Sequence, residues 1–358
     1  MVKKPLDKNS ENLKDYINNG GITLVLGAGV SIGSGVLSWN ELTDKIFDER
    51  GKFNASKILK NSGISLAAIE QSPSSLTINN QIKLEIAGIV NDKKCFRKKD
   101  DKFYEYLKNI LYAEVCCPKR FEKNITLDAL AEIVLRTSKN ISKNPSIKRI
   151  ITFNIDDLLE RAVLEKEENN IDKFKLKIVS HYFQNINVKT KKLLPVYHLH
   201  GFLPSEELLK IFPKYKFKET MQSLVLGDDE YWGIVSNPNS LANTIMMTAL
   251  HDSHCVFIGC SMTDQNIARW LALRMLEVKD EKQKYLTHSQ NKNKIKRNDY
   301  YMNLNSHYWI DGKADSLRAA WLKLRGVHTI DAKDNKLVGE KLKEIFGIRK
   351  QANRRNIK

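Results

Sequence analysis

The segment Ile22-Thr-Leu-Val-Leu-Gly-Ala-Gly-Val-Ser31 decides the fold of this chain. A run of apolar and β-branched residues (22–26) enters a glycine-marked turn, and helical periodicity resumes soon after it. Ile150-Ile-Thr-Phe-Asn-Ile-Asp-Asp157 and Val256-Phe-Ile-Gly-Cys-Ser-Met-Thr-Asp264 repeat this design. Alternating strands and helices predict a parallel sheet whose ligands bind at the carboxyl ends of the strands. We therefore predict an α/β fold with a Rossmann-like, doubly wound, mostly parallel sheet and a helical insertion.

The bulk composition favours a globular protein. The chain has 358 residues, and its 42% hydrophobic and 28% charged content suffices for a sizeable core. No stretch has the apolar length of a membrane span, and the first nine residues lack the apolar core of a signal peptide, so a cytoplasmic location is the default expectation. None of the five cysteines forms a Cys-x-x-Cys pair, so we predict reduced thiols and no metal site.

The formal net charge of +17 at pH 7 has two interpretations. Clustered lysines would form a nucleic-acid surface, because they displace counterions from phosphates. Alternatively, the lysines are spread over a solvated surface. The local runs at 93–94, 189–192 and 292–297 are modest, and no aromatic residues interleave them as a stacking platform requires. We therefore predict no direct nucleic-acid ligand, although some of the charge would attract an anionic dinucleotide.

The pattern along the chain predicts three regions. Residues 1–54 and 148–347 contain the strand–turn–helix units and are expected to form one nucleotide-binding catalytic domain. Residues 55–147 show mostly helical periodicity without such a unit, so we expect a helical insertion that forms a lid or an oligomer surface. Residues 348–358 are expected to be a polar tail.

Individual elements follow from periodicity, caps and glycines. We expect a first helix over 10–18, and the capping-box sequence Ser38-Trp-Asn-Glu41 should open the second. Asp156 or Asp157 should cap a helix that carries Leu158, and a later helix should carry Ile267, Leu271 and Met275. The remaining expectations are strands near 149–153, 177–180, 196–199, 223–226, 255–259 and 327–330, a helix at 337–346, exposed loops at 228–230 and 279–298, and partial burial of Tyr231 and Trp232.

The turn Gly27-Ala28-Gly29 can be interpreted in two ways. Glycine lets a backbone approach a pyrophosphate closely, and the following turn can offer N–H groups to phosphate oxygens. Many strand–turn–helix corners, however, need glycine for steric reasons alone. The Gly-x-Gly-x-x-Gly pattern of dehydrogenases is absent because position 32 is isoleucine, which indicates a chemistry other than hydride transfer.

Two further turns carry side chains suited to chemistry. Asn154 follows a strand and could hold a ribose hydroxyl or a water, whereas helix capping alone would need just one of the polar residues Asn154, Asp156 and Asp157. His200 also follows a strand, and an imidazole that titrates near neutral pH suits proton transfer. A structural role is the alternative for His200. His198 could be mistaken for a metal partner, but no matching ligand spacing supports a metal.

The turn Gly259-Cys-Ser261-Met-Thr-Asp264 can likewise be interpreted in two ways. Ser261 and Asp264 could bind the hydroxyls of a second ribose, or the segment could be a tight turn with a helix cap.

Taken in order, Gly27-Ala-Gly-Val-Ser31, Thr152-Phe-Asn-Ile-Asp156, Leu199-His-Gly201 and Gly259-Cys-Ser-Met-Thr-Asp264 resemble the sirtuin-like NAD-hydrolysing domains of bacterial anti-phage defence systems. The resemblance implies an NAD glycohydrolase that releases nicotinamide and ADP-ribose. Its roles for single residues are the following: Asn154 and His200 as catalytic residues; Gly27, Ala28, Gly29 and Ser31 at the NAD pyrophosphate; Asp156 at the nicotinamide amide; and Gly259, Ser261 and Asp264 at the adenosine end.

Departures from the sirtuin deacylases separate the two branches. Gly35-Val-Leu-Ser-Trp-Asn40 lacks the proline and the arginine that deacylases carry after the first loop, and paired zinc cysteines are absent. These departures favour glycosidic cleavage over deacylation. A protein deacylase and a non-catalytic module that senses NAD or ADP-ribose remain the alternatives.

The resemblance also implies regulation. An NADase that depletes its own cell of NAD in abortive infection must be gated, and related domains are fused to a sensor or paired with a separate protein. The expected catalytic domain extends to residue 347, which leaves little room for a fused sensor, so we expect a partner in trans, with a HerA-type ATPase as the leading candidate. We also expect a homo-oligomer that assembles through the helical insertion. Both expectations rest on the resemblance alone.

Overall fold

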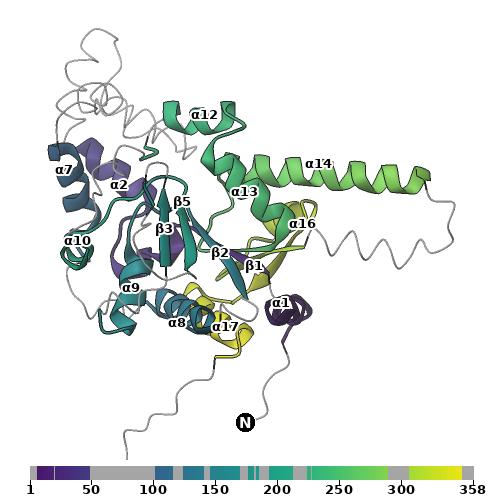
Figure 1. The fold of residues 1–358 in the computed structure, drawn as a ribbon, viewed down its shortest axis with the longest axis horizontal. Helices are drawn as coiled ribbons and strands as arrows, with labels where there is room; N and C mark the ends of the chain where they lie inside the picture. The colour runs from purple at the N-terminus through teal and green to yellow at the C-terminus, as the bar shows by residue number, and fades with distance from the viewer. Residues whose placement is uncertain are drawn as a thin grey trace, which may run out of the picture.

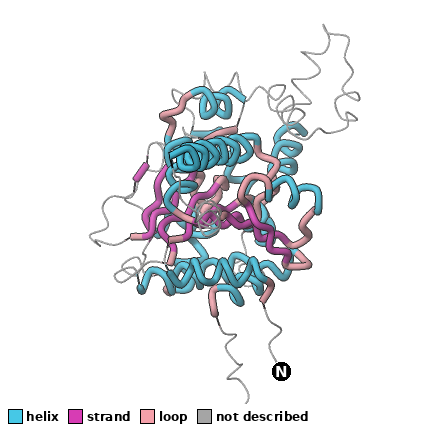
Figure 2. The backbone as a smooth tube through the Cα atoms, turned by 90° about the vertical axis from the view of Figure 1, so that its right-hand side faces the viewer, coloured by secondary structure: helices cyan, strands magenta, loops and turns pink. Residues whose placement is uncertain are grey.

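A computed structural model shows a three-layer α/β molecule (Figures 1 and 2). The central layer is a sheet, and helices cover both of its faces. The residues that the structure describes are 6–19, 21–48, 101–115, 124–140, 146–169, 176–180, 183–184, 193–212, 224–226, 228–288 and 306–348.

The sheet has eight strands in the order β4-β3-β5-β2-β1-β6-β7-β8. Every neighbouring pair is parallel except β3 and β4, so β4 is an antiparallel edge strand. The predicted doubly wound, mostly parallel sheet is therefore confirmed. The strands are β1 (Ile22–Leu26), β2 (Ile147–Thr152), β3 (Leu176–Ser180), β4 (Phe183–Gln184), β5 (Leu194–His198), β6 (His254–Ile258), β7 (His307–Asp311) and β8 (Val327–Asp331).

Strand β1 is central, and it marks the switch point at which the order of successive strands in the sheet reverses. From β1 the chain proceeds to β2 on one side, and β6 later pairs with the other side of β1. Crevices at such switch points, outside the carboxyl ends of the strands, are where open α/β sheets bind ligands. The loops that follow β1, β2 and β6 all lie at this edge.

Helices pack on both faces of the sheet (Figure 1). One face carries α1, α8, α9 and α17, and the other carries α13, α14 and α16. The helices are α1 (Lys8–Asn19), α2 (Trp39–Ile46), α7 (Asp101–Leu111), α8 (Ile125–Asn140), α9 (Leu158–Lys166), α10 (Glu206–Ile211), α12 (Asp228–Ser236), α13 (Leu241–Asp252), α14 (Gln265–His288), α16 (Ser316–Lys323) and α17 (Val338–Ile345), with short 3-10 turns η1 (Ala28–Val30), η2 (Ile32–Ser34) and η6 (Asn335–Leu337).

The two helical layers enclose two separate hydrophobic cores, because successive side chains of a strand point to opposite faces. In β1, Leu24 and Leu26 join the core beneath α8 and α17, whereas Val25 joins the core beneath α13 and α14. All five residues of β1 are buried, as expected for a strand covered on both faces.

Several predicted elements are confirmed with small shifts of their ends. The strand at 22–26 has the predicted bounds. At α2, the Ser38 hydroxyl accepts a hydrogen bond from the Glu41 N–H (3.3 Å), and the Glu41 carboxylate accepts one from the Ser38 N–H (2.7 Å), which confirms the capping box. The cap of α9 is supplied by Asp156, whose Oδ1 accepts a hydrogen bond from the Leu158 N–H at 3.0 Å.

The expectation of a strand at 223–226 is wrong for its described part. Leu224–Leu226 is buried but has no regular structure, and the Val225 N–H donates to the carbonyl of His200, which lies in a turn and not in a ladder. The loop expected at 228–230 is the start of α12, and Trp232 is 51% exposed instead of partly buried. Tyr231 is half-buried, as expected.

The C-terminal half contains more helix and strand than the sequence pattern predicts. Helix α14 continues to His288 through a stretch predicted as an exposed loop, because the lysines, the glutamate and the glutamine of that stretch favour helix even without an apolar face. Residues 289–298 of that expected loop lie outside the described residues. Strand β7 and helix α16 were not anticipated.

Part of the expected insertion belongs to the main α/β body. In α8, Leu127, Leu130 and Val134 are buried in the same core as α9 and α17. Residues 125–140 therefore form part of a helical layer and not a separate lid. The greater part of 55–147 lies outside the described residues, as does 349–358 of the polar tail, and the division into domains remains a prediction.

Candidate functional site at the carboxyl ends of β1, β2 and β5

Sheet register brings three predicted segments together. Strands β2 and β5 pair Thr152 with His198, and hydrogen bonds continue past this pair from the Leu199 N–H to the Thr152 carbonyl at 3.0 Å. Asn154 and His200 thus each lie two residues beyond the last paired residues of neighbouring strands. On the other side of β2, the Phe153 N–H donates to the Leu26 carbonyl at 3.0 Å, next to the glycine turn.

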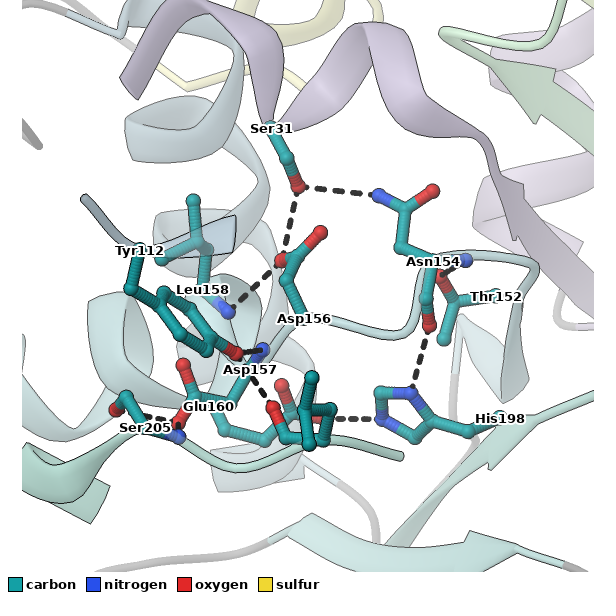
Figure 3. Close-up of polar contacts among 11 residues, drawn as sticks. Ser31, Tyr112, Thr152, Asn154, Asp156, Asp157, Leu158, Glu160, His198 and Ser205 are labelled. Carbon is teal, nitrogen blue, oxygen red and sulfur yellow. Dashed lines mark hydrogen bonds and ion pairs between the residues drawn. The ribbon is translucent and has the colours of Figure 1, made fainter. Parts of the chain in front are cut away.

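Ser31, Asn154 and Asp156 form one hydrogen-bonded cluster (Figure 3). The Asn154 Nδ2 donates to the Ser31 hydroxyl at 3.0 Å and to the Gly27 carbonyl at 3.2 Å. The Ser31 hydroxyl in turn donates to Asp156 Oδ1 at 3.0 Å. Because a backbone carbonyl accepts but cannot donate, the Asn154 nitrogen must face Gly27. The Asn154 Oδ1 is therefore the amide atom that remains available to a ligand.

Asp156 is a buried carboxyl group whose pKa differs from its ordinary value. Its side chain is buried, and burial raises the pKa of Asp156 to about 6, although the Leu158 N–H and the Ser31 hydroxyl act in the opposite direction. A neutral carboxyl can donate as well as accept a hydrogen bond, whereas a carboxylate accepts. Asp156 thus caps α9 and binds Ser31, and its role at a nicotinamide amide remains a prediction.

The glycines in the loops after β1 and β6 have a steric explanation. The Gly29 N–H donates to the Gly259 carbonyl at 2.9 Å, so the two loops are in direct contact. A Cβ at Gly27 would lie 2.6 Å from the Gly259 oxygen, and one at Gly29 would lie 2.8 Å from the Gly259 Cα. Glycine is thus required here for loop packing, whether or not a phosphate binds. Ala28 and Gly29 nevertheless lie exposed on the outer surface of the loop, where a ligand could approach.

In the turn after β6, Asp264 caps the start of α14. Its Oδ1 accepts hydrogen bonds from the N–H groups of Asn266 (2.7 Å) and Ile267 (3.1 Å) and from the Tyr231 hydroxyl (3.1 Å). Ser261 is exposed, and its hydroxyl lies 2.7 Å from that of Thr263. The contacts of Asp264 are thus those of a helix cap, and a role of Ser261 and Asp264 at a second ribose remains a prediction.

The two histidines at the carboxyl end of β5, His198 and His200, occupy different environments. His200 is half-buried in the turn after β5, and its ring packs against Phe153, the neighbour of Asn154, with centroids 5.1 Å apart. His198 ends the strand and is 1% exposed. The His198 side chain contacts Glu160 of α9 and the Asn154 carbonyl, so His200 is the histidine placed at the open end of the sheet.

Sequence reasoning missed several buried polar residues around these loops. Asn124 precedes α8, and its Nδ2 donates to the Val30 carbonyl at 2.8 Å and to the Ser34 hydroxyl at 2.9 Å. Its Oδ1 caps α8 by accepting from the Leu127 N–H at 3.1 Å, a role that an asparagine before an apolar run could have indicated. Asn124 therefore links α8 to the loop that follows β1.

A second network lies beneath Asn154 and Asp156 (Figure 3). The Asp157 Oδ2 accepts hydrogen bonds from the Ser205 N–H and hydroxyl, each at 2.6 Å. The Tyr112 hydroxyl accepts from the Asp157 N–H at 3.0 Å and donates to the Leu203 carbonyl at 2.6 Å. These contacts fix the start of α9 against the segment that follows His200.

Two features bear on partners and cofactors. Within the ranges of the chain that the structure describes, no three His, Cys, Asp or Glu side chains gather closely enough to hold a metal ion. None of the described helices combines the length and the apolar character needed to cross a membrane.

The fold and the motif-bearing strand ends define a Rossmann-like protein with a polar site at the switch point. The family model described as "SIR2-like domain" matches residues 148–330, just over half of the chain, and the chain belongs to this family. Membership supports an NAD-related function of the sirtuin type.

Two other comparisons add little. A solved structure described as "Structural Basis for the Mechanism and Regulation of Sir2 Enzymes" is similar to 96% of this chain over 98% of its own length, with 12% identity and a TM-score of 0.39. No curated protein matches the chain.

Proposed function

We propose that this protein is an NAD⁺ glycohydrolase. The observation that carries the proposal is the cluster in which Asn154 is held by Ser31 and Gly27 beside the buried Asp156, at the switch point of a SIR2-like domain. An amide oxygen that is fixed in direction and left without a partner among the described residues suits a ribose hydroxyl or a water. Mere binding of a dinucleotide would need neither this asparagine nor a histidine at the next strand end.

The proposed reaction breaks the bond between the nicotinamide nitrogen and C1′ of its ribose. Departure of neutral nicotinamide leaves oxocarbenium character on the ribose, and a water oxygen then bonds to C1′. Asn154 would orient the ribose or the water, Asp156 would bind the nicotinamide amide, and His200 would accept the proton that the water loses. The products are nicotinamide, ADP-ribose and a proton released to solvent.

The remaining predicted contacts complete the proposed site. Gly27, Ala28, Gly29 and Ser31 would lie along the pyrophosphate, with Gly259, Ser261 and Asp264 toward the adenosine end. The exposed Ala28 and Gly29 suit a ligand that approaches from outside the loop.

We also propose, on the resemblance alone, that the activity serves anti-phage defence and is gated. A homo-oligomer and a HerA-type ATPase as partner in trans belong to this part of the proposal. It is tested by adding the ATPase to the assay below, and by measuring the mass of the chain in solution.

The decisive experiment separates hydrolysis from deacylation and from binding alone. The protein is incubated with NAD, with or without acetylated peptides, and products are resolved by mass. We expect free ADP-ribose without peptide, and its loss in His200→Ala and Asn154→Ala. The matched controls are His251→Ala and Asn239→Ala, at exposed positions outside the site. Formation of O-acetyl-ADP-ribose would indicate a deacylase, and continued cleavage in both site variants would overturn the mechanism.

A further inference from the structure

Two fully buried ionisable side chains lie beneath Asn154 and have no contact role in the proposed reaction. His198 and Glu160 are each 1% exposed, and they come from β5 and α9. His198 Nε2 lies 2.9 Å from Glu160 Oε1, and His198 Nδ1 lies 3.0 Å from the Asn154 carbonyl oxygen. Figure 3 shows the imidazole between these two partners.

The hydrogen-bond partners determine where the protons are. The Asn154 carbonyl can accept but not donate, so His198 Nδ1 must carry a hydrogen. Contact between Nε2 and Glu160 needs one further proton, which is located either on the imidazole or on the carboxyl. In both arrangements the pair has no net charge, and the Nδ1–H points at Asn154. Burial is the largest single influence and lowers the pKa of His198, but Glu160, the Asn154 carbonyl and Asp156 together raise it above its ordinary value, which favours the imidazolium arrangement.

The pair completes the fixation of residue 154. The Asn154 N–H donates to the Thr152 hydroxyl at 3.0 Å, and its side-chain amide donates to Gly27 and Ser31. His198 holds the remaining backbone polar group. The N–H, the carbonyl and the side-chain nitrogen of Asn154 are thus each bound, and the direction of its Oδ1 follows from these contacts.

We propose that His198, held in place by Glu160, is a positioning residue for NAD cleavage, because the hydrogen bond from His198 Nδ1–H to the Asn154 carbonyl sets the direction in which Asn154 presents its side chain to the ribose. This inference rests on the proposed function. Neither side chain touches substrate. Asp156 is the other ionisable group that faces His198, and Phe202 packs on the imidazole with centroids 4.4 Å apart.

Two substitutions of His198 separate the contacts. In His198→Asn, the side-chain nitrogen takes approximately the place of Nδ1, so it donates to the Asn154 carbonyl but does not reach Glu160. In His198→Gln, the nitrogen takes approximately the place of Nε2, so it reaches Glu160 and leaves the Asn154 carbonyl without a donor. Each variant leaves one buried polar group unpaired, and His198→Asn should lose more thermal stability than His198→Gln because its unpaired group is the buried Glu160 carboxyl.

The readout is kcat and KM for NAD, with the melting temperature of each variant. We expect His198→Gln to lose about 100-fold in kcat, the order of effect that a misplaced catalytic group produces. Its KM should change little. His198→Asn should retain most of the wild-type kcat. Glu160→Gln should also retain kcat. The glutamine amide can donate to His198 Nε2 while His198 Nδ1–H still binds the Asn154 carbonyl, so this variant keeps the geometry and removes the charge.

The outcomes distinguish this inference from the proposed function. Suppose that wild type cleaves NAD and that His198→Asn and His198→Gln each lose kcat merely in proportion to their unfolded fractions. The pair is then merely structural, and the inference is overturned. If the His198 variants do not fold, loss of kcat in a folded Glu160→Gln protein overturns it. If wild type binds ADP-ribose but cleaves no NAD under any condition tested, the proposed function fails first and the positioning role with it.

Discussion

The buried carboxyl group of Asp157, at the start of α9, should make the stability of the fold depend on pH. Asp157 is fully buried, and its Oδ1 has no partner within the described part of the chain, while Oδ2 is bound by Ser205. Burial raises the pKa of Asp157 to about 7, although Arg161 and Ser205 oppose the change. Between about pH 4 and pH 7 the folded chain therefore binds more protons than the unfolded chain. The stability that this group contributes is complete at low pH and is lost as the pH rises through that window.

Asp157→Asn should remove this pH dependence. Its oxygen can still accept from Ser205, and the group no longer ionises. Relative to the variant, the free energy of unfolding of wild type should fall on the order of 4 kcal/mol between pH 4 and pH 8. Urea unfolding at several pH values measures the difference, and the exposed Asp280→Asn serves as the control. Parallel pH curves for wild type and Asp157→Asn would contradict the assignment.

At the scale of elements, the contact between the loops after β1 and β6 should depend on Gly259. This residue has φ +64°, and a Cβ there would lie 2.6 Å from the Val30 nitrogen. Gly347 has nearly the same φ (+67°), but a Cβ there would meet nothing within 4 Å. Alanine at Gly347 should therefore cost about 1 to 2 kcal/mol from backbone strain alone. Alanine at Gly259 should cost about 1 to 3 kcal/mol more, because the loops must move apart.

Chemical unfolding of both glycine variants measures this difference, and ADP-ribose affinity provides the second readout. Gly259→Ala should also weaken ADP-ribose binding, whereas Gly347→Ala should leave the affinity unchanged. Equal destabilisation of the two variants would show that the close approach of the loops contributes nothing.

The elements that could be predicted are those with a local signal. The strand at 22–26 ends at a glycine, and α2 begins with a capping box, so both were found from short stretches of sequence. Strand β7, His307–Asp311, has no alternation, because its first four residues are buried and both faces of the sheet are covered. The extension of α14 was missed because a polar stretch of helix formers has no apolar period.

The candidate site was predictable to a similar degree. Motifs at the ends of parallel strands meet at one edge, so the proximity of Ser31, Asn154 and Asp156 could be expected from topology. The pairing of His198 with Glu160 could not. It depends on how α9 packs against β5, and no spacing in the sequence encodes that contact.

For the whole molecule, specific binding must be distinguished from attraction by charge. A net charge of +17 draws any polyanion, so retention of NAD alone does not demonstrate a site. Attraction between exposed charges is screened by salt within about 8 Å at physiological ionic strength, whereas contacts in a partly buried site persist. Inorganic tripolyphosphate provides the matched probe, since it carries charge without ribose or nicotinamide.

A ligand that binds the folded state alone stabilises it by mass action, and at 100 times its Kd the gain is about 2.7 kcal/mol. We expect ADP-ribose to raise the melting temperature of wild type in both low and high salt, whereas tripolyphosphate should lose its effect in high salt. His200→Ala should keep the ADP-ribose response and also show it with intact NAD, because binding survives while cleavage stops. If the two anions lose their effect together as salt increases, charge alone explains the binding and the proposed site is wrong.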